Sequence, residues 1–179
     1  MPNTVENLLR AMHRSMDEVI APSVPSDNPL AREQSMLVAK ALAFLATQIG
    51  YLHQKDRHEL LAYSDIAAGI LAASDEPERP EALKWLEAAH DRAAAVAVRP
   101  DAASNDVTGA VADLTGAICA LIRARKELSS KVQNALRSNV LTGSKPVLDL
   151  NRSFFLPTGF ERSTDAPPPL AEILTRENT

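Results

Sequence analysis

Stripes of apolar side chains at helical spacing, each bounded by a capping residue or a proline, most constrain what this chain can fold into. In residues 5–20, leucine, methionine, valine and isoleucine recur at three- and four-residue steps, which places them on one side of a helix. Asn3 and Glu6 open this stretch as a capping box, and a proline-rich loop over 21–28 ends it. Alanine, the best helix former, makes up about a sixth of the chain. These features predict an all-α protein.

A second helix is predicted to begin at Asn28 and Pro29, and it is apolar on more than one side, as in the centre of a bundle. A break is predicted near Gln54 and Lys55, because residues 56–59 resemble another capping box. The alternative is one helix from 29 to about 73, which at 1.5 Å per residue would be roughly 65 Å long, unusual in a domain of this size. Further helices are predicted at about 57–73, 80–99 and 105–140.

The character of the sequence changes after Gly143. Residues 144–169 contain five prolines and are predicted to be extended, with a short helix at 170–176. Three of the four phenylalanines lie here, namely Phe154, Phe155 and Phe160, so we expect this tail to pack on the helices or on a partner subunit. The predicted fold is an antiparallel bundle of four to five helices over residues 1–143, with an extended proline-rich tail over 144–179.

Small residues recur at every fourth position along the predicted helix at 105–140. Ala112, Gly116 and Ala120 follow this spacing, which lets another backbone approach closely. We interpret the line as the contact with a neighbouring helix of the bundle or with a dimer partner. Together with Phe154 and Phe155, these residues are the predicted interface candidates.

Positive charge is concentrated in one region, although the whole chain carries a net charge of −4. Residues 121–152 contain seven bases and two acids. Cations near a helix C-terminus favour the helix dipole, which is the simplest explanation. The functional alternatives are an acidic partner or an anionic ligand, for which Arg123, Arg125 and Lys126 are the candidates. Nucleic acid is not expected, because no aromatic residues interleave with these bases before the tail.

No residue pattern predicts catalysis, a metal or a cofactor. Glu87 and His90 have the spacing of a di-iron ligand pair, but such a site needs two pairs and further glutamates. His53 and His58 flank the predicted break, where a solvated junction explains them. The single cysteine, Cys119, lies in the most apolar stretch, so we expect it to be buried. Phosphate-binding glycine loops and dinucleotide fingerprints are absent from the sequence.

The sequence favours a cytoplasmic location. A single cysteine excludes an intramolecular disulfide, and the first residues lack the basic start and apolar run of a signal peptide. The most apolar stretch, residues 110–122, is about 13 residues long and contains Asp113. We therefore expect no membrane-spanning segment.

Residues 7–22 and 37–45 are similar to an uncharacterised bacterial helical domain. That domain occurs beside, or fused to, aminoglycoside-phosphotransferase-like kinases and near acyl-CoA dehydrogenases. The resemblance covers about the first 50 residues, and its motifs are common helical patterning. It implies an accessory protein near acyl-CoA metabolism and carries no catalytic residues over to this chain.

Two functional hypotheses follow. The favoured one is a non-enzymatic interaction module that self-associates as a homo-oligomer or binds a partner protein. The other is a binding protein for an apolar or acyl ligand, possibly linked to coenzyme A, held between helices with its anionic end near the basic region. An enzyme is the least favoured class, because no nucleophile or acid–base pair is evident.

Overall fold

The structure is a computed structural model that describes residues 4–74, 79–159 and 166–175. These residues form eight α-helical segments with short 3-10 and π turns and no strand, which confirms the all-α prediction. Six of the helices have 11 residues or more, rather than the predicted four to five. The chain divides into two compact units, residues 1–52 with 152–166 and residues 53–151 with 167–179, which we describe separately.

The first unit begins with helix α1, Val5–Ser15, which continues through a π turn, Met16–Ile20, into the short helix α2, Ala21–Ser23. Thr4 caps α1, because its hydroxyl accepts the Asn7 backbone N–H at 3.3 Å. The cap thus lies one residue later than predicted, and Asn3 is outside the described residues. Hydrogen bonds from its own backbone N–H and from the Thr4 hydroxyl lower the pKa of Glu6.

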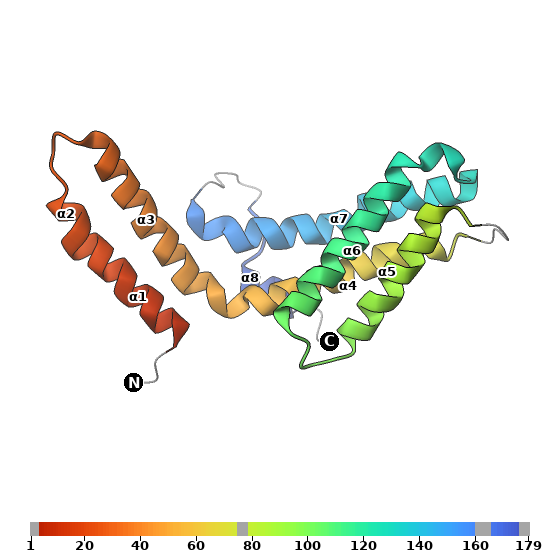
Figure 1. Cartoon of the computed structure of the whole chain (residues 1–179), viewed down its shortest axis with the longest axis horizontal. Helices are drawn as coiled ribbons and strands as arrows, with labels where there is room; N and C mark the ends of the chain where they lie inside the picture. Colours follow the sequence, from red (N-terminus) through yellow and green to blue (C-terminus); the bar gives the residue numbers. More distant parts are fainter. Residues whose placement is uncertain (1–3, 75–78, 160–165, 176–179) are drawn as a thin grey trace. The chain divides into compact units, whose positions relative to one another are not determined.

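Helix α3, Pro29–Gln48, returns alongside α1 and forms a helical hairpin with it (Figure 1). Asn28 caps α3 as predicted, since its side-chain oxygen accepts the Ala31 backbone N–H at 3.1 Å. The hairpin buries few side chains. No residue of α1 is buried, and α3 buries only Ala39, Ala46 and Gln48 among its residues.

The predicted break near Gln54 is wrong. After α3, one 3-10 turn, Ile49–Tyr51, leads directly into helix α4, Leu52–Leu71, so the chain is helical from Pro29 to Leu71. Asp56 and Glu59 do not cap a helix; Glu59 pairs with Lys55 within α4, at the helical spacing of four residues. Arg57 instead donates to the backbone oxygens of Ala97 and Arg99. The uninterrupted alternative is therefore nearer to the observed secondary structure.

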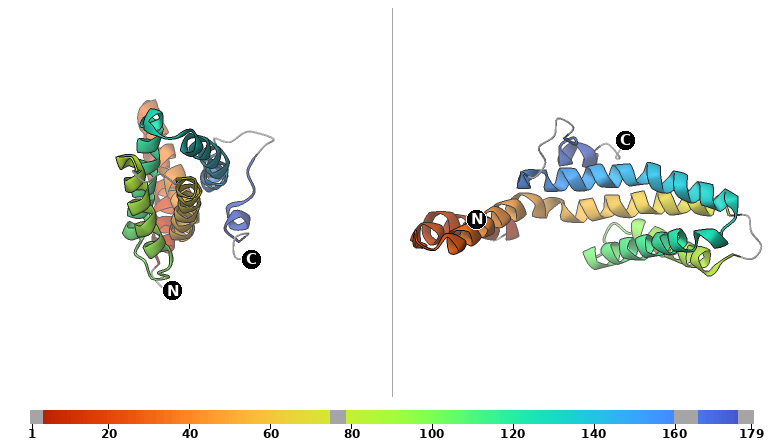
Figure 2. Two further views of the ribbon diagram at one scale, coloured as in Figure 1. Left: turned by 90° about the vertical axis from the view of Figure 1, so that its right-hand side faces the viewer. Right: turned by 90° about the horizontal axis from the view of Figure 1, so that it is seen from above.

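In the second unit, four helices share one hydrophobic core (Figures 1 and 2). They are α4, α5 (Glu81–Ala97), α6 (Ser104–Arg123) and α7 (Ser130–Phe155). Each contributes side chains with almost no exposed surface: Leu60, Ile70, Leu83, Leu86, Val107, Leu114, Leu121 and Val132. The short helix α8, Leu170–Thr175, confirms the helix predicted at 170–176 and buries Leu170 and Leu174.

The single helix predicted at 105–140 is two helices. Helix α6 ends at Arg123, a 3-10 turn follows at Arg125–Glu127, and Leu128 is extended and buried. Ser129 then caps α7, because its hydroxyl accepts the Val132 backbone N–H at 3.4 Å. Leu128 is buried in the shared core at this turn between the two helices. In the sequence, the capping residue Ser129 was the one local signal that a new helix begins here.

The extended tail predicted from residue 144 is also wrong in its first part. Residues 144–155 continue α7 through Pro146, and a 3-10 turn, Leu156–Thr158, follows. A proline inside a helix removes one backbone hydrogen bond and costs about 3 kcal/mol. Burial of Val147, Leu150 and Phe154 on the following turns offsets this cost. Phe160 lies outside the described residues.

Helices α4 and α7 cross closely in antiparallel orientation (Figure 2). A methyl group built on Gly143 of α7 would overlap the side chain of Ile66, and one built on Gly69 of α4 would overlap the Asn139 amide. A hydrogen bond of 2.6 Å from the Asn151 amide to Glu59 continues this contact. Each glycine therefore makes room for a side chain of the opposite helix.

Two helical runs of the described residues are long and apolar enough to cross a membrane, judged by length and composition alone. One is Pro29–Leu71, and the other is α6, which extends beyond the 13-residue stretch considered in the sequence. A core helix of a soluble protein meets the same criteria, and α6 buries Leu114, Ala117 and Leu121 in the shared core. This finding is weak evidence about the membrane.

Candidate functional site

The α1–α3 hairpin carries an apolar side that no described residue of its own unit buries. Val5, Leu8 and Met12 on α1 are 59%, 61% and 47% exposed and follow one another at three- and four-residue steps. On α3, Val38 and Leu45 are each 42% exposed and have the same helical relation. Isolated exposed leucines are ordinary on protein surfaces, but two adjacent stripes on a pair of packed helices indicate an interaction surface. We call these five residues the hairpin stripe.

A different side of the hairpin carries both charged and apolar side chains. A groove of about 730 Å³ runs between α1 and α3, and its lining includes His13, Asp17, Arg32 and Lys40. By the 3.6-residue repeat, Arg32 and Lys40 lie on a different side of α3 from Val38 and Leu45. These charged side chains therefore lie apart from the hairpin stripe, although Met36 and small apolar residues also line the groove.

The last turn of α7 covers a third side of α3. The ring of Phe44 lies 5.7 Å from that of Phe154, edge to face, and 5.5 Å from that of Phe155, stacked. Phe154 is 7% exposed and Phe155 is 50% exposed. The structure thus places these two predicted interface candidates against a phenylalanine of their own chain.

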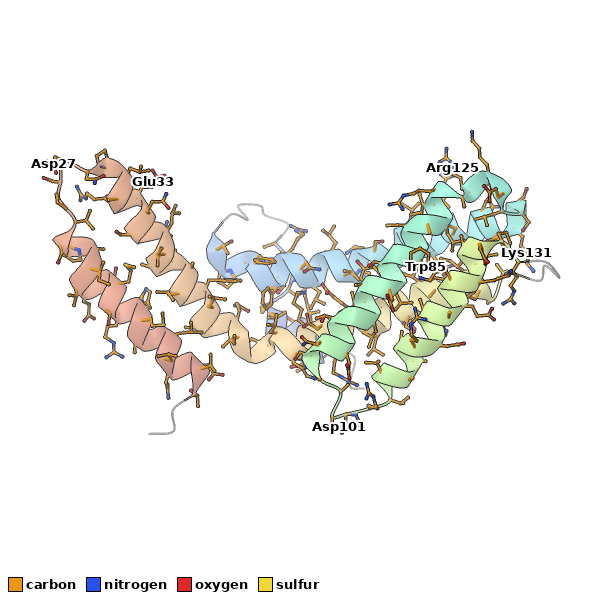
Figure 3. The ribbon with its side chains drawn as sticks, in the orientation of Figure 1. Asp27, Glu33, Trp85, Asp101, Arg125 and Lys131 are labelled. Carbon is orange, nitrogen blue, oxygen red and sulfur yellow. The ribbon has the colours of Figure 1, made fainter. Side chains whose placement is uncertain are left out.

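The small-residue line of α6 also meets its own chain. A methyl group built on Gly116 would lie 3.4 Å from the Trp85 ring of α5 (Figure 3). Ala120 lines a groove of about 780 Å³ beside Trp85, whereas Ala112 is exposed. At that distance a methyl group would make an ordinary contact, so Gly116 faces Trp85 of its own chain without a close approach that requires glycine.

The structure separates the three predicted anion-binding residues, all of which are exposed. Arg123 lines the Trp85 groove, Arg125 lines a different groove between α6 and α7, and Lys126 lines neither of them (Figure 3). Within the described part of the chain, none of these three side chains forms an ion pair. Arg137 joins Arg125 at its groove, although 12 residues separate the two in sequence. Sequence reasoning placed Arg137 in the basic region but did not single it out.

The residues considered for chemistry are not assembled into a site. Glu87 pairs with Arg79 at 2.6 Å, and His90 is half-buried. His53 contacts the Ser104 hydroxyl at 3.3 Å, and the unbroken α4 does not bring His58 onto its side. Among the described residues, no three histidine, cysteine or acidic side chains are grouped so that they could hold a metal ion.

Cys119 is exposed, so the prediction of its burial is wrong. The side of α6 that faces the core is set by Leu114, Ile118 and Leu121, and Cys119 lies about 100° or more around the helix from each of them. An apolar stretch in the sequence does not determine which of its residues face inward, because only one side of the helix meets the core.

A buried charged cluster was not predicted. The ammonium of Lys55 lies 2.8 Å from Glu59 and 3.9 Å from Asp56, and the Asn151 amide donates to Glu59 at 2.6 Å. Burial raises the pKa of Asp56, Lys55 opposes this rise, and Glu59 adds to it. The cluster lies outside the three described grooves and links α4 with α7, so we interpret it as structural.

No protein-family model matches the chain, and no curated protein or solved structure matches it either. The resemblance of its first 50 residues to the bacterial helical domain therefore stays a prediction.

Proposed function

We propose that this protein is a non-enzymatic interaction module that self-associates as a homodimer through the hairpin stripe. The observation that supports this proposal is that most of the exposed large hydrophobic side chains lie on or next to the hairpin. Of the 19 large hydrophobic residues that are exposed in the described part of the chain, 12 fall within residues 5–52. The second unit, in contrast, has a core of its own. The hairpin is the part of the described chain that leaves its apolar side uncovered.

The physical reason for association is the incomplete burial of the stripe side chains. Complete burial of a leucine, valine or methionine contributes about 1.5–3 kcal/mol relative to full exposure. The stripe residues are about half exposed, so covering them contributes about 1 kcal/mol each. In a two-fold dimer the same patch is buried on both subunits, which doubles the contribution.

A second copy of the chain is favoured as the partner, because the hairpin does not repel itself. Residues 4–48 contain five acidic and four basic side chains, a net charge of −1. Two such hairpins can pack face to face as four helices, an arrangement in which each apolar stripe meets another. A partner recognised by charge would instead favour a hairpin with a strong excess of one sign.

The experiment compares matched leucine substitutions by sedimentation velocity between 1 and 100 μM. Leu8→Glu and Leu45→Glu place a charge in the stripe, whereas Leu148→Glu, at a leucine of α7 that is 57% exposed, is the control. We expect the unsubstituted protein and Leu148→Glu to dimerise over this range. The two hairpin variants should remain monomeric with unchanged helical circular dichroism.

Two results would refute the proposal. One is a monomer at every concentration for the unsubstituted protein. The other is equal disruption of the dimer by Leu148→Glu, which would mean that the stripe has no special role.

Vesicles of neutral phosphatidylcholine distinguish dimerisation from the alternative that the stripe binds a membrane. A monomer that cosediments with these vesicles, and loses this property in Leu8→Glu, would assign the stripe to a lipid surface instead.

A further inference from the structure

The groove between the end of α6 and α7 differs from the others in its charge. It has a volume of about 660 Å³ and is lined by Ile122, Arg125, Gln133, Asn134, Leu136, Arg137, Val140 and Leu141. Two guanidinium groups line it, and none of its lining residues is acidic. In the Trp85 groove, Glu81 and Glu127 balance Lys84 and Arg123. The hairpin groove likewise contains acids and bases in equal number, besides one histidine.

Both arginines at this groove are available for a ligand. Neither Arg125 nor Arg137 forms an ion pair with any residue of the described ranges, and both are exposed. The groove holds them on two different helical segments, one in the turn after α6 and one on α7. A planar guanidinium can bind a carboxylate with two parallel hydrogen bonds, which gives direction as well as charge.

Apart from the amide side chains of Gln133 and Asn134, the remaining wall of the groove is apolar. Leu136 is buried and Val140 is half-buried, while Ile122 and Leu141 are 44% and 68% exposed. On α7 the lining residues run from Gln133 to Leu141 at helical spacing, so the groove follows this helix for about 12 Å. Arg137 lies midway along this run, and Val140 and Leu141 form its far end, about one helical turn further on.

We propose that this groove binds a single-chain anionic amphiphile, with the anionic head at Arg125 and Arg137 and the hydrocarbon chain along Val140 and Leu141. The volume lies in the range of about 300–1,000 Å³ that small-molecule sites occupy. A bare anion would leave the apolar wall unused, and single-stranded nucleic acid would favour aromatic side chains, which this lining lacks. This inference goes beyond self-association and rests on a different unit of the chain.

The test is calorimetric titration of the full chain with dodecanoate below its micelle concentration. Dodecanol, dodecyltrimethylammonium and butyrate serve as neutral, cationic and short-chain comparisons. We expect one dodecanoate to bind per chain and the three comparison ligands to bind at least tenfold more weakly. Arg125→Gln should weaken dodecanoate binding roughly tenfold, and the double variant Arg125→Gln/Arg137→Gln should weaken it further.

Lys126→Gln is the matched control, because it removes the same charge from the neighbouring residue, which does not line the groove. It should leave dodecanoate binding within about twofold of the unsubstituted protein. Equal binding of dodecanoate to the double arginine variant would overturn the proposal, as would equal binding of dodecyltrimethylammonium. Butyrate binding as tight as dodecanoate would also overturn it, since the apolar wall would then have no role. Leu8→Glu should not change any of these results, so failure of this proposal is distinct from failure of self-association.

Discussion

The close crossing of α4 and α7 predicts that one substitution, glycine to alanine, has opposite effects at two helical positions. In an open helix this change stabilises by about 1 kcal/mol, because alanine has the higher helix propensity. Gly109 of α6 has no atom within 4 Å of the position that a methyl group would take. Gly109→Ala should therefore raise the free energy of unfolding by about 0.5–1 kcal/mol.

At Gly143 the same methyl group would overlap Ile66, which is 3% exposed and packed in the core. Overpacking a core costs about 1–3 kcal/mol, which exceeds the gain in helix propensity. We expect Gly143→Ala to lower the free energy of unfolding by about 1–2 kcal/mol. Urea unfolding followed by circular dichroism at 222 nm measures both variants under the same conditions.

A double-mutant cycle with Ile66→Ala identifies the cause. Ile66→Ala alone leaves a cavity and should cost about 2–5 kcal/mol. Gly143→Ala should then cost little in its presence, because the methyl group fills part of that cavity, so the coupling energy should reach about 1 kcal/mol or more. If Gly143→Ala stabilised the protein as much as Gly109→Ala does, the close crossing of α4 and α7 would be refuted.

Three further predictions concern the buried charges and the cysteine. Because burial raises the pKa of Asp56 from its ordinary value of 3.8, the folded state holds this proton to higher pH than the unfolded state. The free energy of unfolding should therefore fall as pH rises from the pKa of Asp56 in the unfolded state to its higher pKa in the folded state. Urea titrations from pH 3 to 7 should show a smaller fall for Asp56→Asn than for the unsubstituted protein. An equal fall in the two proteins would refute this prediction. Glu59→Gln removes the carboxylate that lies 2.8 Å from the Lys55 ammonium. It should lower the free energy of unfolding by about 3 kcal/mol near neutral pH. A decrease of less than about 1 kcal/mol would show that the ion pair is not effectively buried. Exposed Cys119 should react with a thiol reagent in the folded protein as fast as in urea, whereas a lag that urea abolishes would show that it is covered.

Local chemistry in the sequence determined the all-α class and several helix starts. Asn28 caps α3 as predicted, and α5 and α6 begin at Glu81 and Ser104, each within one residue of the predicted starts at 80 and 105. Such signals are reliable because a cap depends on hydrogen bonds and backbone angles within a few residues. The apolar stripe of α1 was likewise evident, since its period is a property of the helix alone.

Only the tertiary structure decided where helices continue and where they turn. Pro146 lies inside α7, although proline ordinarily ends a helix, because the turns after it bury Val147, Leu150 and Phe154. Leu128 interrupts the predicted helix because it enters the shared core. In both places the burial of distant apolar side chains outweighs the local preference of the backbone.

The candidate sites show the same division. The basic region and the apolar hairpin residues were visible in the sequence, but their grouping was not. Arg137 meets Arg125 at one groove only because the chain turns between α6 and α7. Gly116 was predicted to face a helix or a dimer partner, and the structure places Trp85 of the same chain against it. Sequence periodicity specifies which side of a helix a residue occupies, whereas the packing of helices specifies what covers that side, and this depends on contacts between residues far apart in the chain.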